Sequence, residues 1–560
     1  MLKFTFPLLL ALTFPSCNGC EKPPDTPYKA SQKTLEEEFK RLEKRQLIRK
    51  APVKKLDKSK ALTVAIPYLP DHLNPWLNIN KWGYQIAMHQ IYEGLVKRDP
   101  KTGKLIPALA TSWQMEDEGK VYRFWIRKGV RWQDGRPLSI EDVIFTFNLL
   151  TMPKMKKGPF IRDIDQSLMR VDKIGARGIR VVLSHPNAYF MEHLAELPII
   201  PSHVFFKGVS EKSRGSTNPV GTGPYRLYQW IKGESVILER NEFYWGPTPE
   251  VHRLVFKKVA DPAKAFVGIR RHQVDIMPQI SPIHYPVQIT DSIKNHYKLY
   301  RFVPPDFSYL LWNTRDPVLS DFRVRRALSL LIDRKSISEK VFRGLAVPCE
   351  GPFWRPGGLG DPSIKAEAYN PEKARELLDQ VGWKDHDGDG IRDLKGAPMK
   401  LIVLHPVGAK RGLKVLQAIK NNYFRMGIEM VIVPTDWHLL GQHLKKRKFS
   451  ATYLTWRGRP YEDFSPIFHS DGRFNYSVVY SIFIDRLLGR MKKSLTFTGL
   501  SQLSILLEQN LAANPPMAFL FRPVHMSVVS RRFTNVIPSW DGFRYARFRL
   551  DTTRQPPIIN

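Results

Sequence analysis

The sequence predicts an α/β protein built from several compact units. From Leu62 onward, short apolar segments separated by Gly and Pro alternate with helical segments, which is the pattern typical of this class. Of the 560 residues, 42% are hydrophobic and 25% are charged. This is enough apolar material for buried cores, and it excludes a disordered or fibrous chain. At roughly 100 to 200 residues per unit, the length predicts about three or four units.

Several helices are predicted from local pattern. The ranges 81–95, 139–150 and 371–381 read as helical segments. Asp321 is placed to cap a helix that extends to Asp333. In that helix apolar residues recur at helical spacing, and three arginines are expected to face outward.

Strands and tight connections are predicted in the same way. Alternate side chains of Val121 to Ile126 point to opposite faces, which predicts a strand in a sheet covered on at least one side. Gly221, Gly223 and Pro224 predict a place where two backbone segments pass close together, before the strand Tyr225 to Trp230.

Charge and cysteine content restrict the function. Lys and Arg number 87 against 53 Asp and Glu, for a net charge of +34, and the basic residues are spread along the chain. This spread and the N-terminal signal described below disfavour nucleic acid as a partner, whereas an anionic lipid or polymer remains an alternative. Three cysteines exclude a disulfide-stapled scaffold and a multi-cysteine zinc site. After the N-terminus no apolar run reaches about 18 residues, so the body is not expected to span a membrane.

The N-terminus has the organisation of a secretory signal. A positive charge at Lys3 precedes the apolar stretch from Phe4 to Phe14 and the small residue Ser16. Cys17 directly after it resembles a bacterial lipobox, although the preceding Phe14-Pro15 departs from the usual pattern. We therefore predict a signal peptide over 1–16 and acylation of Cys17, with export and soluble release as the alternative. Residues 17–60 are expected to form a tether and a charged helix.

Searches for catalytic motifs indicate a binding protein and no enzyme. The chain has no His-Glu-x-x-His helix, no Gly-x-Ser-x-Gly elbow, no phosphate-binding loop and no dinucleotide fingerprint. No cofactor is expected.

One acidic loop resembles a calcium loop. Asp385, Asp387, Asp389 and Asp393 occupy its positions 1, 3, 5 and 9, but position 12 is Gly396 where a bidentate Glu is required. We favour a turn in which the aspartates accept hydrogen bonds from their own backbone. Any calcium affinity is then expected in the weak range, about 10⁻⁴ to 10⁻³ M.

Motifs in four blocks together resemble the family 5 extracellular solute-binding proteins, the oligopeptide and dipeptide receptors of bacterial ABC importers. The resemblance covers the chain from Leu62 to about Ser530. The motifs include Leu73-Asn74-Pro75, Ile91 to Val96, Trp132 to Leu138, Asn218 to Tyr225, Trp312-Asn313-Thr314, Ile332-Asp333-Arg334 and Tyr369-Asn370-Pro371.

The resemblance implies a two-lobed periplasmic-binding-protein clamshell of type II, with the extra subdomain of the peptide-binding class. We expect the first lobe at 61–302 plus 522–560, with the subdomain at about 99–205, and the second lobe at 303–521.

The implied function is to capture a peptide or peptide-like solute between the lobes and present it to a membrane permease. The protein is expected to be a periplasmic or otherwise extracytoplasmic monomer, anchored to the membrane by its lipid. The alternative is a basic envelope protein that binds an anionic polymer or lipid surface without transport.

The expected ligand contacts centre on one loop of the second lobe. Peptide receptors of this family carry Trp-x-x-Asp there, with the aspartate on the peptide's α-amino group, whereas this chain has Trp456-Arg457-Gly458-Arg459. A cation cannot serve an ammonium group, so the loop predicts an anionic group on the ligand. The alternative is that both arginines pair with Glu462 and Asp463. The full set of predicted ligand-binding residues is Trp456, Arg457, Arg459, Tyr461, Tyr476, Trp312, Asn313 and Trp354.

Overall fold

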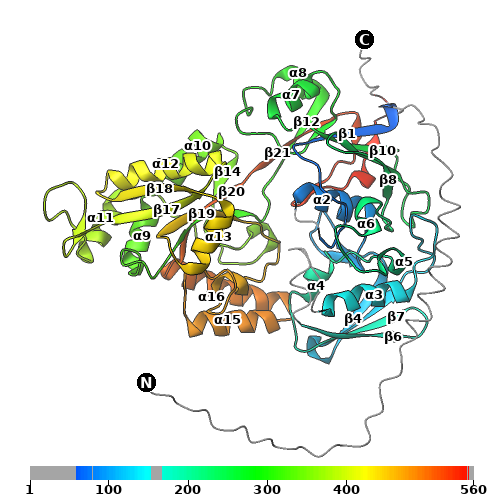
Figure 1. The fold of residues 1–560 in the computed structure, drawn as a ribbon, viewed down its shortest axis with the longest axis horizontal. Coiled ribbons are helices and arrows are strands. Elements are labelled where there is room, and N and C mark those ends of the chain that lie inside the picture. Colours follow the sequence, from blue (N-terminus) through cyan, green and yellow to red (C-terminus); the bar gives the residue numbers. More distant parts are fainter. Residues whose placement is uncertain (1–57, 78–79, 153–166, 552, 554–560) are drawn as a thin grey trace, which may run out of the picture. The chain divides into compact units, whose positions relative to one another are not determined.

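Two large sheets are present among the described residues, and the first has seven strands. The computed structural model describes residues 58–77, 80–152, 167–551 and 553; Figure 1 shows their helices and strands. Strand β1 pairs parallel with β10 and β11, and the other pairs are antiparallel. The order across the sheet is β12 (Tyr297–Phe302), β21 (His525–Ser530), β11 (Ile276–Met277), β1 (Ala61–Ile66), β10 (Arg253–Lys258), β9 (Ser235–Arg240) and β8 (Tyr225–Ile231).

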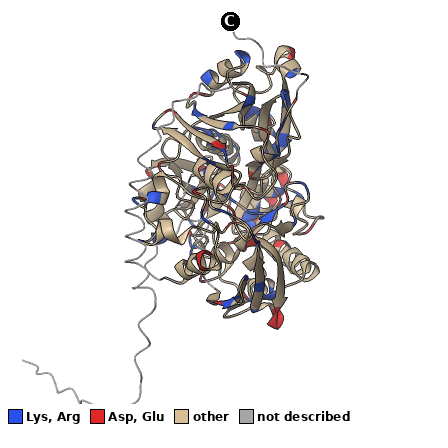
Figure 2. Ribbon diagram, turned by 90° about the vertical axis from the view of Figure 1, so that its right-hand side faces the viewer, with Lys and Arg blue, Asp and Glu red and all other residues tan. Residues whose placement is uncertain are grey.

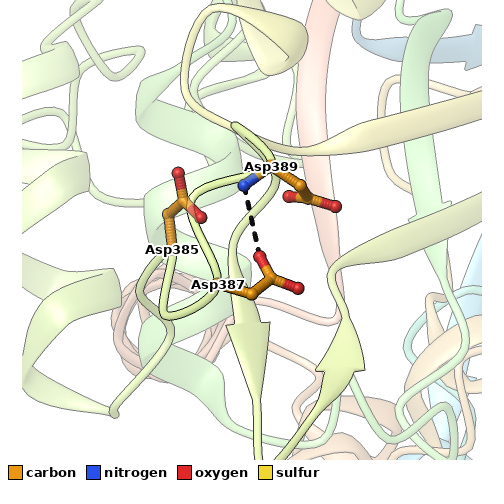
Figure 3. A group of neighbouring side chains, drawn as sticks. All are labelled: Asp385, Asp387 and Asp389. Atoms are coloured by element: carbon orange, nitrogen blue, oxygen red, sulfur yellow. Dashed lines mark hydrogen bonds between the residues drawn. The ribbon is translucent and has the colours of Figure 1, made fainter.

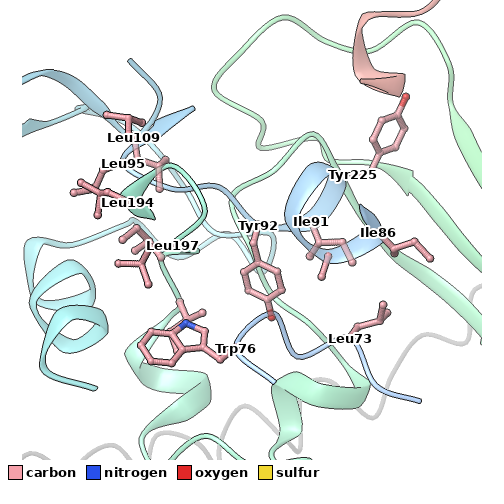
Figure 4. Close-up of a cluster of buried hydrophobic side chains, with 14 of the residues drawn as sticks. Leu73, Trp76, Ile86, Ile91, Tyr92, Leu95, Leu109, Leu194, Leu197 and Tyr225 are labelled. Carbon is pink, nitrogen blue, oxygen red and sulfur yellow. The ribbon is translucent and has the colours of Figure 1, made fainter. Parts of the chain in front are cut away.

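The core beside this sheet continues into the subdomain. In β1, Leu62, Val64 and Ile66 on one face are fully buried, and Ala61 and Ala65 on the other face are buried as well, as expected for a central strand covered on both faces. They belong to one apolar cluster with the side chains in Figure 4, where Trp76, Ile91 and Tyr92 lie with Leu73, Ile86, Leu95, Leu109, Leu194, Leu197 and Tyr225. The first lobe and its subdomain therefore share one hydrophobic core.

The helix predicted over 81–95 is shorter than expected. Helix α2 (Lys81–Ile86) begins after Asn80, whose side chain accepts a hydrogen bond from the Gly83 N–H. It continues as one π-helical turn, η2 (Ala87–Ile91). The prediction was wrong at the C-terminal end, because the backbone of Tyr92 is already extended and carries the chain toward the next strand.

The subdomain contains a four-stranded antiparallel sheet. Its order is β4 (Ala110–Glu116), β5 (Val121–Ile126), β7 (Gly178–Leu183) and β6 (Leu168–Ile174). In β5 the side chains of Tyr122, Phe124 and Ile126 are buried while Trp125 is exposed, which confirms the predicted alternation. Helix α3 (Ile140–Thr151) begins with a capping box between Ser139 and Asp142, and this confirms the helix predicted over 139–150.

The second large sheet has six strands among the described residues. The order is β14 (Ala346–Pro348), β20 (Met517–Pro523), β13 (Phe307–Trp312), β19 (Ala451–Trp456), β17 (Lys400–Pro406) and β18 (Glu429–Thr435). Strands β17, β18 and β19 are mutually parallel. Their carboxyl ends therefore share one edge, and the loop that begins at Arg457 leaves from it.

Helices pack on both faces of this second sheet and form two separate cores. One core includes residues of α9 (Phe322–Leu330), α10 (Arg334–Phe342), α11 (Pro371–Gln380) and α12 (Lys410–Phe424). The other includes residues of α13 (Trp437–Lys446), α14 (Ser465–Phe468), α15 (Ile482–Lys493) and α16 (Phe497–Ala513). Helix α11 confirms the helix predicted over 371–381.

The segment 321–333 holds a shorter helix than predicted. Asp321 caps α9 as expected, its side chain accepting from the Arg323 N–H. However, α9 ends at Leu330, and Asp333 caps the next helix, α10. The prediction that three arginines face outward was wrong for Arg325, which is buried. Its guanidinium donates to the carbonyls of Leu319, Ser320 and Pro515, which would otherwise lack partners.

The chain crosses between the two large sheets twice. Residues 303–306 join β12 to β13, and Val524 alone separates β20 from β21. The indole of Trp354 donates to the Val303 carbonyl at 2.9 Å, which ties the second lobe to one crossing. The first crossing lies at the proposed boundary 302/303, whereas β20 extends the second sheet to Pro523, two residues beyond the proposed boundary at 521/522.

Short elements complete the described chain. The strands are β2 (Val96–Arg98), β3 (Leu105–Pro107), β15 (Asp393–Leu394), β16 (Ala397–Pro398), β22 (Phe533–Thr534), β23 (Pro538–Ser539), β24 (Gly542–Phe543) and β25 (Arg549–Leu550). The helices are η1 (Lys58–Lys60), η3 (Asp117–Gly119), α4 (Phe190–Leu194), α5 (Ser202–Phe205), α6 (Arg214–Thr217), α7 (Pro262–Arg270), α8 (Asp291–His296), η4 (Arg355–Gly357) and η5 (Tyr545–Arg547).

Candidate functional site

Two adjoining cavities lie between the lobes. Their volumes are about 420 and 560 Å³, and both are lined by Arg98, Pro100, Pro460, Trp540 and Arg544. The first lobe contributes α2, η2, the β2–β3 hairpin and the C-terminal segment 535–549, and the second lobe contributes the loop after β19 and the segment 354–357. A space of this size, lined by both lobes, can enclose a small solute.

An ion pair across this cleft joins the lobes. Arg459 lies in the loop after β19, and its Nε is 2.9 Å from Oε2 of Glu196, which follows α4 in the subdomain. The Arg459 N–H also donates to Glu462 at 2.8 Å. Both side chains of the pair are largely buried, 13% and 12% exposed. Burial raises the pKa of Glu196, and Arg459 opposes that rise. Because its two residues belong to different lobes, this ion pair forms only when the lobes are closed on each other.

The subdomain makes further contacts with the second lobe beside this pair. Tyr189 is 1% exposed and belongs to the same apolar cluster as Phe307 and Phe464 of the second lobe. The Ala188 N–H donates to the Lys492 carbonyl at 2.7 Å. The 187–196 segment therefore forms, together with the two crossings, a third connection between the lobes.

A second charged cluster lies at the start of α2. Oδ1 of Asp306 accepts from the Gly458 N–H at 3.2 Å, and Lys81 and Arg457 both act on this carboxylate. Burial raises the pKa of Asp306, and the two cations oppose that rise. Burial and the Arg457 charge lower the pKa of Lys81 to about 8, against the pull of Asp306. Two cations thus act on the carboxylate of Asp306 at this position.

The C-terminal segment forms one wall of the cleft and is held by a buried triad. Asp541 lies 3.1 Å from Nε2 of His89 and 2.7 Å from Nη2 of Arg544, while Nη1 of Arg544 is 3.0 Å from Nδ1 of His89. Burial, with the Arg544 charge, lowers the pKa of His89. A neutral His89 that accepts from Arg544 and donates to Asp541 satisfies all three groups.

Three of the eight residues predicted to contact ligand line these cavities. Arg459 lines the smaller cavity, and Trp354 and Tyr461 line the larger one. Arg457 is exposed next to Asp306. Trp456 and Tyr476 are partly buried against the core of the second lobe, and both rings contact Phe474.

Trp312 and Asn313 do not reach the cleft. Trp312 is 0% exposed in the core of the second lobe. Asn313 is buried, and its side chain donates to the carbonyls of Arg447 and Phe449. Both residues support β13 and its neighbours, so the proposed binding set excludes them.

Several cleft residues were missed from the sequence. Lys81, Glu196, Asp306 and the segment around Asp541 have no local motif, and the bond between Arg459 and Glu196 joins positions 263 residues apart. The positive charge of the chain did not point to the cleft either, because Lys and Arg, blue in Figure 2, are scattered over the described ribbon.

A family model decides the broad assignment. The model for bacterial extracellular solute-binding proteins, family 5 (middle region), matches residues 104–475. This chain belongs to that family. The family 5 membership confirms the resemblance found in the sequence, and with it the prediction of an extracytoplasmic binding protein that is no enzyme.

Curated relatives and solved structures agree with family 5. The dipeptide-binding protein of Escherichia coli is 27% identical over 70% of this chain and 74% of its own. The oligopeptide-binding protein AppA of Bacillus subtilis is 26% identical over 78% of this chain and 81% of its own.

Two solved structures are similar in fold. AppA of Bacillus subtilis with a nonapeptide has a TM-score of 0.73 at 23% identity. NikA of Brucella suis with Fe(III)-EDTA has a TM-score of 0.78 at 20% identity. These alignments cover 88% of this chain and 99% or 100% of those chains, and they confirm the clamshell fold.

In the acidic loop of this family 5 protein, the aspartate side chains accept hydrogen bonds from backbone N–H groups of the same loop. Figure 3 shows Asp385, Asp387 and Asp389 together, with the Asp389 N–H donating to Asp387. Asp385 accepts from Gly388 and Gly390, and Asp389 accepts from Ile391. Asp393 turns back to accept from the His386 N–H. These contacts agree with the structural interpretation, and the weak calcium affinity stays a prediction.

Among the described residues, no helix is both long and apolar enough to cross a bilayer.

Proposed function

We propose that the chain is the substrate-binding component of an ABC importer and captures a peptide or peptide-like solute that carries an anionic group. The names of its curated relatives, a dipeptide-binding and an oligopeptide-binding protein, support a peptide as the solute and a permease as the partner. The single observation that carries the anionic group is the cluster beside the cleft, in which the positive charges of Lys81 and Arg457 both act on the Asp306 carboxylate.

Capture follows from closure of the lobes. A ligand held between the lobes makes contacts in the closed state that the open state lacks, so it shifts the population by that difference in affinity. The closed form is then the one that the permease recognises. The protein acts as a monomer in this scheme, since one chain supplies both walls of the cleft.

We assign the ligand anion to Arg457 and Lys81. Arg459 pairs with Glu196 across the cleft and with Glu462 in its own loop, which suits it to hold the lobes together. Arg457 is exposed, and its planar guanidinium has the geometry that binds a carboxylate or phosphate. Trp354 and Tyr461 offer apolar surface in the larger cavity. Tyr68, partly exposed and influenced by the Arg457 charge, lies near the same cluster.

Ligand affinity should therefore fall as the pH rises through about 8. The pKa of Lys81 is lowered to about 8 in the free protein, so its charge, and its attraction for the ligand anion, is lost above that value. An anionic ligand favours the charged form, so protons are taken up on binding near pH 8. Native mass spectrometry would first identify the co-purified solute. Isothermal titration with that solute from pH 7 to 9 would then measure affinity and proton uptake.

The control for this test is Lys81→Met, which should bind more weakly at pH 7 and show no change near pH 8. An affinity that is flat from pH 7 to 9 in the native chain, or a co-purified solute with no anionic group, would contradict the assignment.

We also propose that acylated Cys17 anchors the protein to the membrane. Cys17 and the charged segment 31–57 lie outside the described residues. Since each buried CH₂ contributes about 0.8 kcal/mol, a cysteine with several chains can hold a protein on a bilayer. Cys17→Ser should shift the protein from the membrane fraction to the soluble fraction of cells. Retention of the variant in the membrane fraction at physiological salt would show that another part of the chain is the anchor.

A further inference from the structure

A basic and apolar ridge lies on the second lobe, on a part of the surface that the cleft does not use. Lys445, Lys446, Arg447 and Lys448 follow one another at the C-terminal end of α13. Tyr480, Ile482 and Phe483 surround the start of α15 and are 66%, 71% and 52% exposed. We call these seven residues the ridge.

Contacts around Arg447 join its segment to the segment that leads into α15. The Arg447 guanidinium lies 5.5 Å from the ring centroid of Tyr476. Burial lowers the pKa of Arg447, and Tyr480 lies close enough to act on its charge. The side-chain amide of Asn313 donates to the Arg447 carbonyl at 3.1 Å, and the neighbouring Thr314 hydroxyl donates to the Ser477 carbonyl at 2.7 Å. These contacts place Arg447, and with it the end of the basic run, beside the segment 476–480 that leads into Ile482 and Phe483.

The carboxylates on these elements do not cancel the positive charge. Asp436 caps α13 by accepting from the His438 N–H at 2.7 Å, about three helical turns from the four cations. Asp485 accepts from the Ser470 N–H at 2.8 Å, and Asp316 accepts from the Val318 N–H at 2.9 Å. Arg315 and Arg486 are exposed beside the apolar side chains and add to the positive charge.

We propose that the ridge docks on the anionic surface of a phospholipid bilayer. A soluble polyanion would pair with the four cations but would give Ile482 and Phe483 no apolar phase to enter. A bilayer with anionic headgroups satisfies both halves, because clustered Lys and Arg bind the headgroups while aromatic and aliphatic side chains enter the interface. An acidic segment of a permease is the competing partner. The four cations are consecutive in the chain, and lysine side chains are flexible. Such side chains suit the diffuse charge of a bilayer surface better than a few carboxylates in fixed positions, so we favour the bilayer.

Docking at the ridge would orient the protein on the membrane whether or not a ligand is bound. It also would not depend on acylation of Cys17. It adds an interaction to the proposed transport function, and it can be tested with no knowledge of the solute.

The test is sedimentation of the full chain, carrying Cys17→Ser to remove the lipid, with vesicles. Phosphatidylcholine vesicles are compared with mixed phosphatidylcholine and phosphatidylglycerol vesicles at low and physiological salt. We expect binding only to the mixed vesicles, weaker at the higher salt. Replacing Lys445, Lys446 and Lys448 together with Gln should weaken that binding about tenfold or more. Ile482→Ser with Phe483→Ser should weaken it by a similar factor, since both side chains would otherwise be buried in the interface.

The matched controls lie on α12, which packs on the other core of the same sheet. Lys410, Lys414 and Lys420 are exposed there, and replacing all three with Gln removes the same charge as the ridge variant. Phe424, 67% exposed, replaced with Ser controls for an apolar surface. Both should change binding by less than about twofold, because these positions lie beyond the screening distance of a bilayer docked at the ridge. All substituted side chains are exposed, so an unchanged thermal midpoint is expected throughout.

Equal loss in the α12 charge variant would show that net charge alone drives binding. Equal binding to both kinds of vesicle would show that the ridge does not recognise anionic headgroups. No loss in the ridge variants would show that the ridge is not the membrane contact and would leave a protein partner for it. Each of these outcomes overturns the proposal, and none of them bears on solute capture in the cleft.

Discussion

Replacing Arg459 with aspartate should weaken solute binding by about 100-fold or more, equivalent to about 3 kcal/mol. Arg459 lies 2.9 Å from Glu196 across the cleft, so the substitution places three carboxylates, those of residues 196, 459 and 462, near one another in the closed state. When the lobes open, Glu196 moves away from residues 459 and 462, and the repulsion is relieved. A ligand that binds the closed form must then overcome this penalty.

Isothermal titration with the co-purified solute measures the loss, and small-angle scattering shows whether the lobes still close. Arg490→Asp makes the same change at an exposed position of α15 and should leave affinity unchanged. Equal affinities for Arg459→Asp and the native chain would mean that Arg459 contributes neither to closure nor to ligand contact.

Glu196→Gln separates two roles of Arg459. If the arginine holds the lobes together, losing its partner across the cleft should weaken binding as well, though less than Arg459→Asp does. If the arginine contacts the ligand anion directly, removing Glu196 frees it, and affinity should rise. The contacts favour the first role, because Glu196 and Glu462 already engage the guanidinium and the backbone of Arg459.

The architecture could be predicted because its signals are local. Ser139 and Asp142 form a capping box within four residues, and the alternation of β5 is complete in six. Arg325 shows the limit of such patterns. Helical spacing placed Arg325 on a polar face. In the structure its guanidinium donates hydrogen bonds to three carbonyls, one of them 190 residues away at Pro515. Burial of a charged group depends on acceptors that the local sequence does not contain.

The site was predicted only in part for the same reason. The loop from Trp456 could be found because it departs from the family pattern. Its partners are distant: Glu196 lies 263 residues before Arg459, and His89 and Arg544 are 455 residues apart. Trp312 was misplaced because a large aromatic residue in a strand fits a core as well as a cleft, and only packing decides between them.

Gly221 supports the cleft from behind, and replacing it with alanine should destabilise the fold by roughly 3 kcal/mol or more. There is no room for a side chain at Gly221, because a Cβ there would overlap the Ile91 carbonyl oxygen and lie 2.6 Å from the carbonyl carbon. Both are backbone atoms, so no side-chain rotation can relieve the clash. The same approach is held by Gln133, whose Oε1 accepts from the Gly221 N–H at 3.0 Å and whose Nε2 donates to the Ile91 carbonyl at 3.1 Å.

Gly489→Ala is the matched control for this change. Gly489 lies in α15, and a Cβ there would meet nothing within 4 Å, so alanine should stabilise the helix by up to about 1 kcal/mol. Urea unfolding of both variants measures the difference. Because Ile91 ends η2, whose His89 lines the cleft, Gly221→Ala should also weaken solute binding, while Gly489→Ala should leave it unchanged. A Gly221→Ala protein as stable as the native chain would show that the η2 backbone can move aside at no cost, and the cleft wall would then be far less rigid than these contacts require.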